Sequence, residues 1–332
     1  MATLRNCNRG FLKPPTQMGL NVSSKNIAIT GATGLLGSHL ANSYISSGHQ
    51  VFALIKDQHS KSILSPLVIR VFGDISRKSD IEYFIQKSDP DIFVHLAAQT
   101  QAYDSLRYPY QTFYNNIVGT LNVLDCLREY KNAESILVAS SDKAYGELKG
   151  DTYSEDHSLN GIYPYDASKS ATDLVSNSYR ETYGMPISVT RACNIYGSGD
   201  YNRQRLIPGI VDAFKRDEEF IIRNSGSDLR EYIHVEDVVS AYLKILELTK
   251  KSTRSSDFNI ASGDRFTTME VFNHIQDVIG SPIRHKVLNS SSMEIKKQFM
   301  NSTKLSTETG WSPKMKFLKV LPSTVDWYLQ NY

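Results

Sequence analysis

Several common kinds of site are not expected, because the sequence lacks their defining residues. Its 332 residues include only three cysteines, Cys7, Cys126 and Cys193, and no CxxC pair. A disulfide framework and a cysteine-based metal site are therefore not predicted, and a reducing compartment, the cytoplasm, fits this composition. The eight histidines are scattered and none belongs to an HExxH pattern, so no metal site is predicted.

The chain also lacks a strong charge of either sign and any long apolar run. Its formal net charge is +2, which gives no support to nucleic acid as a partner. No apolar run approaches the roughly 18 residues of a membrane span, so no membrane partner is expected. Hydrophobic residues still make up 40% of the chain, which suffices for one large domain or two closely packed ones.

Acidic residues are absent from the first 24 residues, which contain Arg5, Arg9 and Lys13. This stretch has no apolar core of a secretory signal, and its few serines argue against a transit peptide. We expect residues 1–24 to form a disordered extension, or translation to begin at Met18.

The sequence does contain a cluster of reactive side chains after an apolar run. Ile136 to Ala139 is typical of a buried parallel strand, and Ser141, Asp142 and Lys143 follow it. Such a strand delivers side chains to a site at its carboxyl end. We therefore predict that this hydroxyl, carboxylate and amine face one small molecule.

Tyr165 and Lys169 lie four residues apart, so on a helix they share a face. An ammonium near a phenol favours the phenolate and lowers the phenol's pKa. We expect Lys169 to lower the pKa of Tyr165 in this way, and both side chains to join the reactive cluster.

A glycine-rich turn near the start of the chain predicts a dinucleotide site. Residues 25–30 are typical of a strand, and a helix is expected over about 35–46. Gly31, Gly34 and Gly37 would allow a tight turn, close approach of backbone to a pyrophosphate, and tight packing of helix on strand. Three glycines alone are a weak signal, but between a strand and a helix they are a strong one.

The second predicted strand, over 48–57, bears on the choice between NAD and NADP. Its last residue, Asp57, lies 20 residues beyond Gly37, where an acidic residue would hold the adenosine ribose. The neighbouring Lys56 would instead meet a 2′-phosphate. Either residue would equally suit a solvated strand end, so the sequence leaves both cofactors open.

The third and fourth predicted strands also end near the expected cofactor site. A strand over 68–73 leads to Asp74, which would either contact the adenine or cap the following helix. A strand over 91–96 contains His95, which we expect to be a core histidine with satisfied ring nitrogens. The two alanines after it would let the backbone pass close to a flat cofactor.

Helices and strands alternate along the rest of the chain. Further helices are expected over about 110–130, 165–182, 208–214, 230–250 and 269–279 and from 317, with further strands over 186–191, 220–223 and 257–260. This alternation predicts an α/β fold with a doubly wound parallel sheet. We place the dinucleotide-binding domain at 25–195 and a smaller α/β substrate lobe at 196–332, with some exchange of strands and helices between them.

Four motifs together resemble the extended short-chain dehydrogenase/reductase superfamily. They are Thr30-Gly-Ala-Thr-Gly-Leu-Leu-Gly37, Tyr165-x-x-x-Lys169, Arg191-x-x-Asn194-x-Tyr-Gly197 and Arg230-x-Tyr-x-x-Val-x-Asp237, and Gly310-Trp-x-Pro313 adds to them. The resemblance runs from about residue 25 to the end of the chain. It implies a Rossmann-type domain that holds NAD or NADP, a C-terminal lobe that holds a nucleotide-diphosphate sugar, and a homodimer.

The stretch Ser140-Ser-Asp-Lys-Ala-Tyr-Gly146 resembles one branch of that superfamily. Its 4-epimerases usually carry hydroxyl or small residues where Asp142 and Lys143 stand, whereas the Asp-Lys form is similar to the CDP-glucose 4,6-dehydratases. His95-Leu-Ala-Ala-Gln99 and Arg205-Leu-Ile-Pro208 are similar to the same branch. Tyr201 departs from it, since those enzymes usually carry tryptophan there, and they lack the Arg-x-Tyr-x-x-Val-x-Asp form seen here.

The resemblance implies roles for individual residues in an internal redox reaction that yields a 4-keto-6-deoxy sugar. Lys143 would be the base at C5 or a charge that stabilises an enolate. The catalytic residues implied are Ser141, Asp142, Lys143, Tyr165 and Lys169. Those implied for the substrate are Gln99, Ser141, Asn194, Arg205, Leu206 and Arg230. Those implied for the cofactor are Gly31, Thr33, Gly34, Leu35, Leu36, Gly37, Lys56, Asp57, Asp74, Ile75, Leu96, Ala97, Ala98, Gln99, Tyr165 and Lys169.

Two other functions are compatible with this pattern. A nucleotide-sugar 4-epimerase would use Tyr165, Lys169 and Ser141 but would not need Asp142 or Lys143. A non-catalytic NAD(P)-binding protein usually loses the tyrosine or the lysine of the pair, and both are present here. The pattern therefore favours a 4,6-dehydratase.

Overall fold

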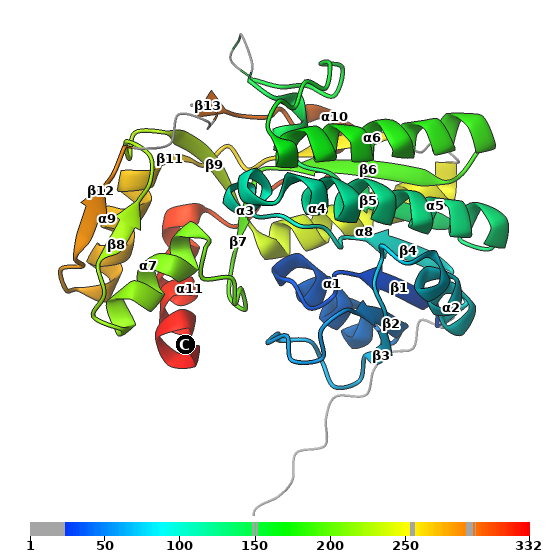
Figure 1. Cartoon of the computed structure of the whole chain (residues 1–332), viewed down its shortest axis with the longest axis horizontal. Helices are drawn as coiled ribbons and strands as arrows, with labels where there is room; N and C mark the ends of the chain where they lie inside the picture. Colours follow the sequence, from blue (N-terminus) through cyan, green and yellow to red (C-terminus); the bar gives the residue numbers. More distant parts are fainter. Residues whose placement is uncertain (1–23, 148–149, 151, 253–255, 290–294, 296) are drawn as a thin grey trace, which may run out of the picture.

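The computed structural model describes residues 24–147, 150, 152–252, 256–289, 295 and 297–332, so the predicted extension at 1–24 lies almost wholly outside it. Seven parallel strands form the central sheet, in the order β10-β6-β5-β4-β1-β2-β3 (Figure 1). The strands are β1 (Asn26–Thr30), β2 (Gln50–Ile55), β3 (Ile69–Phe72), β4 (Ile92–His95), β5 (Ser135–Ala139), β6 (Ile187–Ala192) and β10 (Asp257–Ile260). Strand order reverses between β1 and β4, and a crevice forms at the carboxyl ends of such strands.

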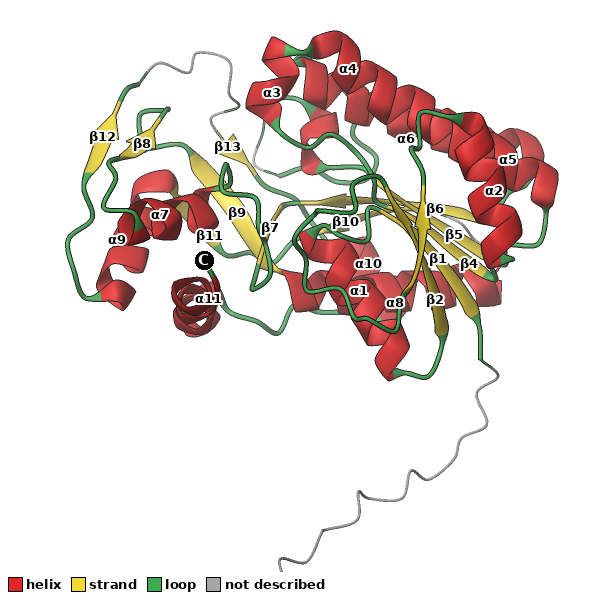
Figure 2. Ribbon diagram, turned by 60° about the horizontal axis from the view of Figure 1, so that its bottom comes forward, coloured by secondary structure: helices red, strands yellow, loops and turns green. Residues whose placement is uncertain are grey.

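Helices cover both faces of this sheet (Figure 2). On one face lie α1 (Leu35–Ser46), α8 (Val235–Ser252) and α10 (Thr303–Thr309). On the other lie α2 (Lys78–Ser88), α5 (Gly119–Tyr130) and α6 (Pro164–Tyr183). This arrangement confirms the predicted doubly wound α/β fold. Helix α8 and strand β10 belong to it although they come from the part of the chain after residue 196.

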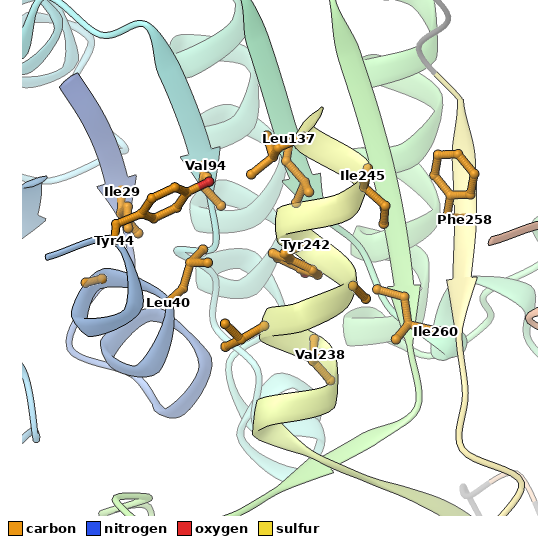
Figure 3. Close-up of a cluster of buried hydrophobic side chains, with 14 of the residues drawn as sticks. Ile29, Leu40, Tyr44, Val94, Leu137, Val238, Tyr242, Ile245, Phe258 and Ile260 are labelled. Carbon is orange, nitrogen blue, oxygen red and sulfur yellow. The ribbon is translucent and has the colours of Figure 1, made fainter. Parts of the chain in front are cut away.

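The buried core on the α1 and α8 face is drawn in Figure 3. Tyr242 and Ile245 of α8 lie against Leu137 of β5 and Val94 of β4, and all four side chains are fully buried or nearly so. Burial of both faces explains why these strands are apolar runs rather than alternating ones. The core thereby holds the carboxyl ends of the central strands in fixed positions.

A smaller lobe lies beside the sheet, on the left of Figure 1. Its helices are α7 (Leu206–Lys215), α9 (Thr268–Ile279) and α11 (Phe317–Asn331), which pack around a separate apolar cluster. Its strands are β7 (Asn194–Tyr196), β8 (Phe220–Ile222), β9 (Leu229–His234), β11 (Arg265–Thr267), β12 (His285–Val287) and β13 (Lys297–Gln298).

The prediction of a helix over 230–250 is wrong at its start. Leu229–His234 forms strand β9, and the helix begins only at Val235. Strand β9 pairs with β7, β11 and β13, and its residues Tyr232 and Ile233 are buried. These pairings across the lobe outweigh the helical periodicity of the segment.

The long helix predicted over 110–130 is interrupted. It consists of α4 (Pro109–Phe113), a π-helical turn (Tyr114–Val118) and α5, and a further helix, α3 (Ala102–Arg107), precedes it. The wide turn carries Asn116, whose buried amide accepts from Gln99 N at 2.7 Å and donates to Gln99 O at 3.1 Å. Asn116 thus fixes the backbone that follows β4.

Candidate active site

A cleft of about 680 Å³ lies at the carboxyl ends of the central strands. Its walls come from the turn after β1, the ends of β2 to β6, the start of α6, and the lobe residues around α7 and α11. It falls within the usual size range of ligand sites. The predicted residues that line it are Gly31, Thr33, Gly34, Leu35, Leu36, Gly37, Lys56, Asp74, Ile75, Leu96, Ala97, Ala98, Gln99, Ser141, Asp142, Lys143, Tyr165, Lys169, Asn194, Arg205 and Leu206.

The glycine turn has the shape that a dinucleotide diphosphate requires. Gly31 has φ +74°, and a Cβ there would lie 2.7 Å from the backbone N of Ala97, so a side chain is excluded. A Cβ on Gly34 would meet only Gly31 O, at 3.4 Å, which leaves open space on its cleft side. No side chain of the described residues caps the first turn of α1, so its N–H groups are available to an anion. These residues fit the diphosphate of NAD.

At the adenosine end, Lys56 rather than Asp57 faces the cleft. The amine of Lys56 lies 2.8 Å from the carboxylate of Asp74. Burial would raise the pKa of Asp74, but hydrogen bonds from Lys56 and Ser76 hold it below the usual value. Asp57 is exposed and accepts a hydrogen bond from the backbone N of His59, so the structure does not bring it to the cleft. The cap of α2 is Arg77, and the capping role considered for Asp74 is not observed.

His95 is a core residue, as we predict from the sequence. Its ring nitrogens lie 2.8 Å from Thr30 Oγ1 and 3.2 Å from Thr120 Oγ1. Burial, assisted by the positive charge of Lys169, lowers the pKa of His95 to about 3, so the ring is neutral. Its role is to join β4 to β1 and α5 behind the cleft.

The reactive cluster after β5 comes together in a 3-10 turn, Asp142–Tyr145. The hydroxyl of Ser141 donates to Asp142 Oδ1 at 2.9 Å, and Asp142 itself is only 4% exposed. The other oxygen, Asp142 Oδ2, has no hydrogen-bond partner within the described part of the chain. It lies 3.8 Å from the amine of Lys143, which also donates to Gln298 Oε1. A hydroxyl, a buried carboxyl and an amine therefore share one wall of the cleft.

Tyr165 and Lys169 project from the first turns of α6 into the same cleft. The amine of Lys169 donates to the carbonyl of Ala139 at 2.7 Å. Burial lowers the pKa of Lys169 to about 8, against the opposing effect of Asp173. The amine is therefore ready to exchange protons near neutral pH.

The expectation that Lys169 lowers the pKa of Tyr165 is not met in this structure. Burial and the charge of Asp142 raise the pKa of Tyr165 to about 12, and hydrogen bonding with Ser141 and the charge of Arg205 only partly offset them. The physical reason is that the amine of Lys169 is directed to the carbonyl of Ala139. The phenol is therefore protonated until another positive charge approaches it.

Three of the residues predicted to bind the substrate are only partly brought together. Asn194 lines the cleft, but its side-chain amide donates to Glu231 O at 3.0 Å. Arg205 lines the cleft at the start of α7 and pairs with Asp200 at 3.1 Å. Arg230 is not among the lining residues and lies 3.7 Å from the carboxylate of Asp228.

Some lining residues have no signal in the local sequence. Tyr328 reaches the cleft from α11 and donates to Gly197 O at 2.7 Å, although 131 residues separate the two. In the sequence of α11, Tyr328 cannot be told apart from the other apolar positions of an amphipathic helix.

Two kinds of feature are not found within the described residues. None of their helices is long and apolar enough to cross a membrane. No group of three or more histidine, cysteine, aspartate or glutamate side chains among them is arranged to hold a metal ion.

Known proteins resemble this chain in sequence. Residues 27–261 match the model of the NAD dependent epimerase/dehydratase family. A trifunctional UDP-glucose 4,6-dehydratase/UDP-4-keto-6-deoxy-D-glucose 3,5-epimerase/UDP-4-keto-L-rhamnose-reductase of Arabidopsis thaliana is 27% identical over 323 residues, covering 92% of this chain and 48% of the relative. The chain thus spans about half the length of the curated relatives that match it first.

Solved structures resemble it in fold. A dTDP-glucose 4,6-dehydratase from Bacillus anthracis in complex with NAD has a TM-score of 0.81 at 25% identity, covering 93% of this chain and 97% of that one. A UDP-glucose 4-epimerase from Thermotoga maritima with UDP-glucose has a TM-score of 0.82 at 25% identity, covering 92% of this chain and 99% of that one. A dehydratase and an epimerase are therefore equally similar to it, and the similarity to CDP-glucose enzymes stays a prediction.

The predicted superfamily is confirmed, and of the two cofactors that the sequence leaves open the family description names NAD. The matching family is NAD-dependent by its description and covers the whole sheet from β1 to β10. The glycine turn, the reactive cluster after β5 and the pair on α6 all lie within the matched residues. The chain belongs to the NAD dependent epimerase/dehydratase family.

Proposed function

We propose that this protein is a nucleotide-sugar 4,6-dehydratase, which converts a nucleotide-diphosphate hexose to its 4-keto-6-deoxy derivative. The observation that carries the proposal is the pair Asp142 and Lys143 in the same cleft as Tyr165 and Lys169. An epimerase moves one hydride at C4 and has no use for a buried carboxyl and amine beside the tyrosine. A dehydratase needs both, because it must also remove a proton at C5 and a hydroxyl at C6.

Tyr165 and Ser141 act on the sugar's 4-hydroxyl. The phenolate of Tyr165 takes the hydroxyl proton as hydride leaves C4, while Ser141 hydrogen-bonds the 4-oxygen. NAD, when bound, supplies the carrier for the hydride that leaves C4 and later returns to C6. The phenol's pKa of about 12 in the structure must fall for this step, and a positive charge that approaches the phenol in the loaded cleft would favour the phenolate.

Lys143 and Asp142 then eliminate water from the 4-ketone. The C5–H bond breaks, and its proton passes to the nitrogen of Lys143. The electron pair forms the C5–C6 double bond as the C6–O bond breaks, and the proton of Asp142 joins the leaving hydroxyl to make water. When hydride returns to C6, Lys143 gives C5 a proton that has exchanged with solvent, so substrate oxidation and reduction balance. Tyr165 then passes the proton of the 4-hydroxyl through water to Asp142, which returns both residues to their starting states.

The substrate is held by the lobe in this proposal. Asn194 and Arg205 line the cleft, and Arg suits a diphosphate through its bidentate fork. Gln99 and Leu206 line the same cleft. The nucleotide base is left to experiment, with CDP-glucose as the first substrate to try.

The test is to incubate the purified protein with CDP-, UDP-, GDP- and dTDP-hexoses in heavy water and to analyse the products by mass spectrometry. Loss of one water with one solvent deuterium gained at C5 supports the dehydratase. A product of unchanged formula with inverted C4 supports the second candidate, a 4-epimerase, which the equal similarity to epimerases favours.

A further inference from the structure

Gln298 brings a buried amide from the C-terminal part of the chain to the reactive cluster. It lies on β13, which pairs with β9 in parallel, with Gln298 opposite Arg230. Its side chain is only 1% exposed. The amide oxygen accepts a hydrogen bond from the amine of Lys143, although 155 residues separate them.

Burying this amide is energetically unfavourable, which indicates that its oxygen makes a functional contact. Its Nε2 is buried and has no hydrogen-bond partner among the residues that the structure describes. A buried donor without a partner is unfavourable, and an apolar side chain of the same shape would pack there without that loss. Packing alone therefore does not account for glutamine, whereas an acceptor for Lys143 does.

The amine of Lys143 lies near two oxygens. One is Gln298 Oε1, and the other is Asp142 Oδ2 at 3.8 Å, itself without a hydrogen-bond partner within the described residues. A lysine nitrogen stands on a flexible four-carbon stem, and proton transfer requires it to be held in one direction. Both the charged and the neutral amine carry an N–H for Gln298, so the contact orients the nitrogen in either state.

We propose that Gln298 is the positioning residue that orients Lys143 for proton transfer at C5. The inference rests on the 4,6-dehydratase proposed above. Gln298 is not among the residues that line the cleft, so it acts through Lys143 rather than on the sugar. It affects the elimination step and leaves the earlier oxidation at C4 to Tyr165 and Lys169.

Two substitutions separate this role from packing. Gln298→Met keeps the length of the side chain and removes the acceptor. Gln298→Glu keeps an acceptor oxygen at the same reach and serves as the matched control for a changed buried side chain. We expect Gln298→Met to lower kcat about 10- to 100-fold with little change in KM, since small misplacements of a reacting group have such effects. Gln298→Glu should recover most of the turnover as the pH is raised, because its added carboxylate favours the protonated amine of Lys143, which cannot take the C5 proton. Gln298→Met should not recover with pH.

The distinguishing measurement is made within one turnover, with the sugar nucleotide that the wild-type protein dehydrates. In Gln298→Met, absorbance of the reduced nicotinamide should rise at the wild-type rate and persist, because oxidation at C4 proceeds while elimination is slow. Incorporation of solvent deuterium at C5 should slow in parallel with kcat. Equal slowing of both steps, or a kcat equal to that of the wild type, overturns the proposal.

A second measurement does not depend on turnover. In protein labelled with ¹⁵N-lysine, the side-chain resonance of Lys143, assigned by its loss in Lys143→Arg, should shift in Gln298→Met. An unchanged resonance in Gln298→Met overturns the inference. Failure of the wild-type protein to dehydrate any sugar nucleotide overturns the proposed function instead, and the two failures are thus told apart.

Discussion

The guanidinium of Arg191 and the carboxylate of Asp173 form an ion pair of 2.7 Å in the protein interior, where neither side chain is more than 2% exposed. Arg191 lies on β6, and Asp173 lies one turn beyond Lys169 on α6. The same guanidinium also pairs with Asp257 of β10 at 2.9 Å. This network fastens α6 to the sheet, and so sets where Lys169 meets the end of β5. The arginine of the Arg191 motif is thus a structural residue.

Breaking this pair should strongly destabilise the fold. We expect Arg191→Met to lower the free energy of unfolding by about 3–5 kcal/mol, because it leaves buried carboxylate charge without its partner. Chemical denaturation followed by circular dichroism measures the loss. The double variant Arg191→Met/Asp173→Leu should recover part of it, and a loss below about 1 kcal/mol in the single variant would contradict a buried, coupled pair.

Tyr165→Phe should abolish turnover without displacing the cofactor. Removing the phenol's proton transfer is expected to lower kcat about 10²- to 10⁴-fold. NAD binding, measured by calorimetry, should be nearly unchanged, since the ring remains in place. Activity within a few-fold of the wild type would mean that another residue takes the 4-hydroxyl proton.

Asp142→Asn should separate the two halves of the proposed reaction. The amide retains the hydrogen bond from Ser141 but has no proton to give to a leaving hydroxyl. Oxidation at C4 should therefore continue while release of water falls about 10²-fold or more. Single-turnover absorbance and mass spectrometry report the two steps, and an equal rate of water release in the variant would show that another residue acts as the acid.

Stability near pH 9 should depend on Lys169. Because its pKa is about 8 in the folded protein and 10.5 as its ordinary value, the unfolded chain binds the extra proton between these limits. The free energy of unfolding contributed by Lys169 therefore rises with pH from about 8 to 10.5 and is lowest below pH 8.

Lys169→Met removes this dependence. Relative to the variant, the wild-type protein should gain stability as the pH rises from 8 to 10, as measured by denaturant unfolding at each pH. Lys319→Met, at an exposed position of α11, is the control. A constant difference between the wild type and Lys169→Met across this range would show that Lys169 keeps its ordinary pKa.

The predicted homodimer can be tested on the helices that cover one face of the sheet. Leu121 of α5 is 36% exposed and Leu174 of α6 is 61% exposed, whereas Val175 and Tyr179 pack partly against the core. We expect Leu121→Glu/Leu174→Glu to convert a dimer to a monomer in sedimentation experiments. Leu318→Glu, at an apolar position on α11 that is 52% exposed, should leave the dimer intact, and an unchanged dimer in both variants would place the interface elsewhere.

The local sequence determined the glycine turn, the strand that carries Ser141 to Lys143, and the spacing of Tyr165 and Lys169. Each is a short-range pattern, since a strand end, a turn and one helical turn are specified by neighbouring residues. The alternation of apolar strands and helices was sufficient to predict the doubly wound sheet, and the structure confirms that prediction.

Tertiary structure alone decided which distant residues complete the site. Gln298 meets Lys143 and Tyr328 meets Gly197 across more than 130 residues, and no local pattern marks either one. The pKa of Tyr165 and the strand at 229–234 differ from expectation for the same reason, because burial and pairing depend on segments that fold against them. The residues capable of chemistry are evident in the sequence, and only the fold shows how each one is held.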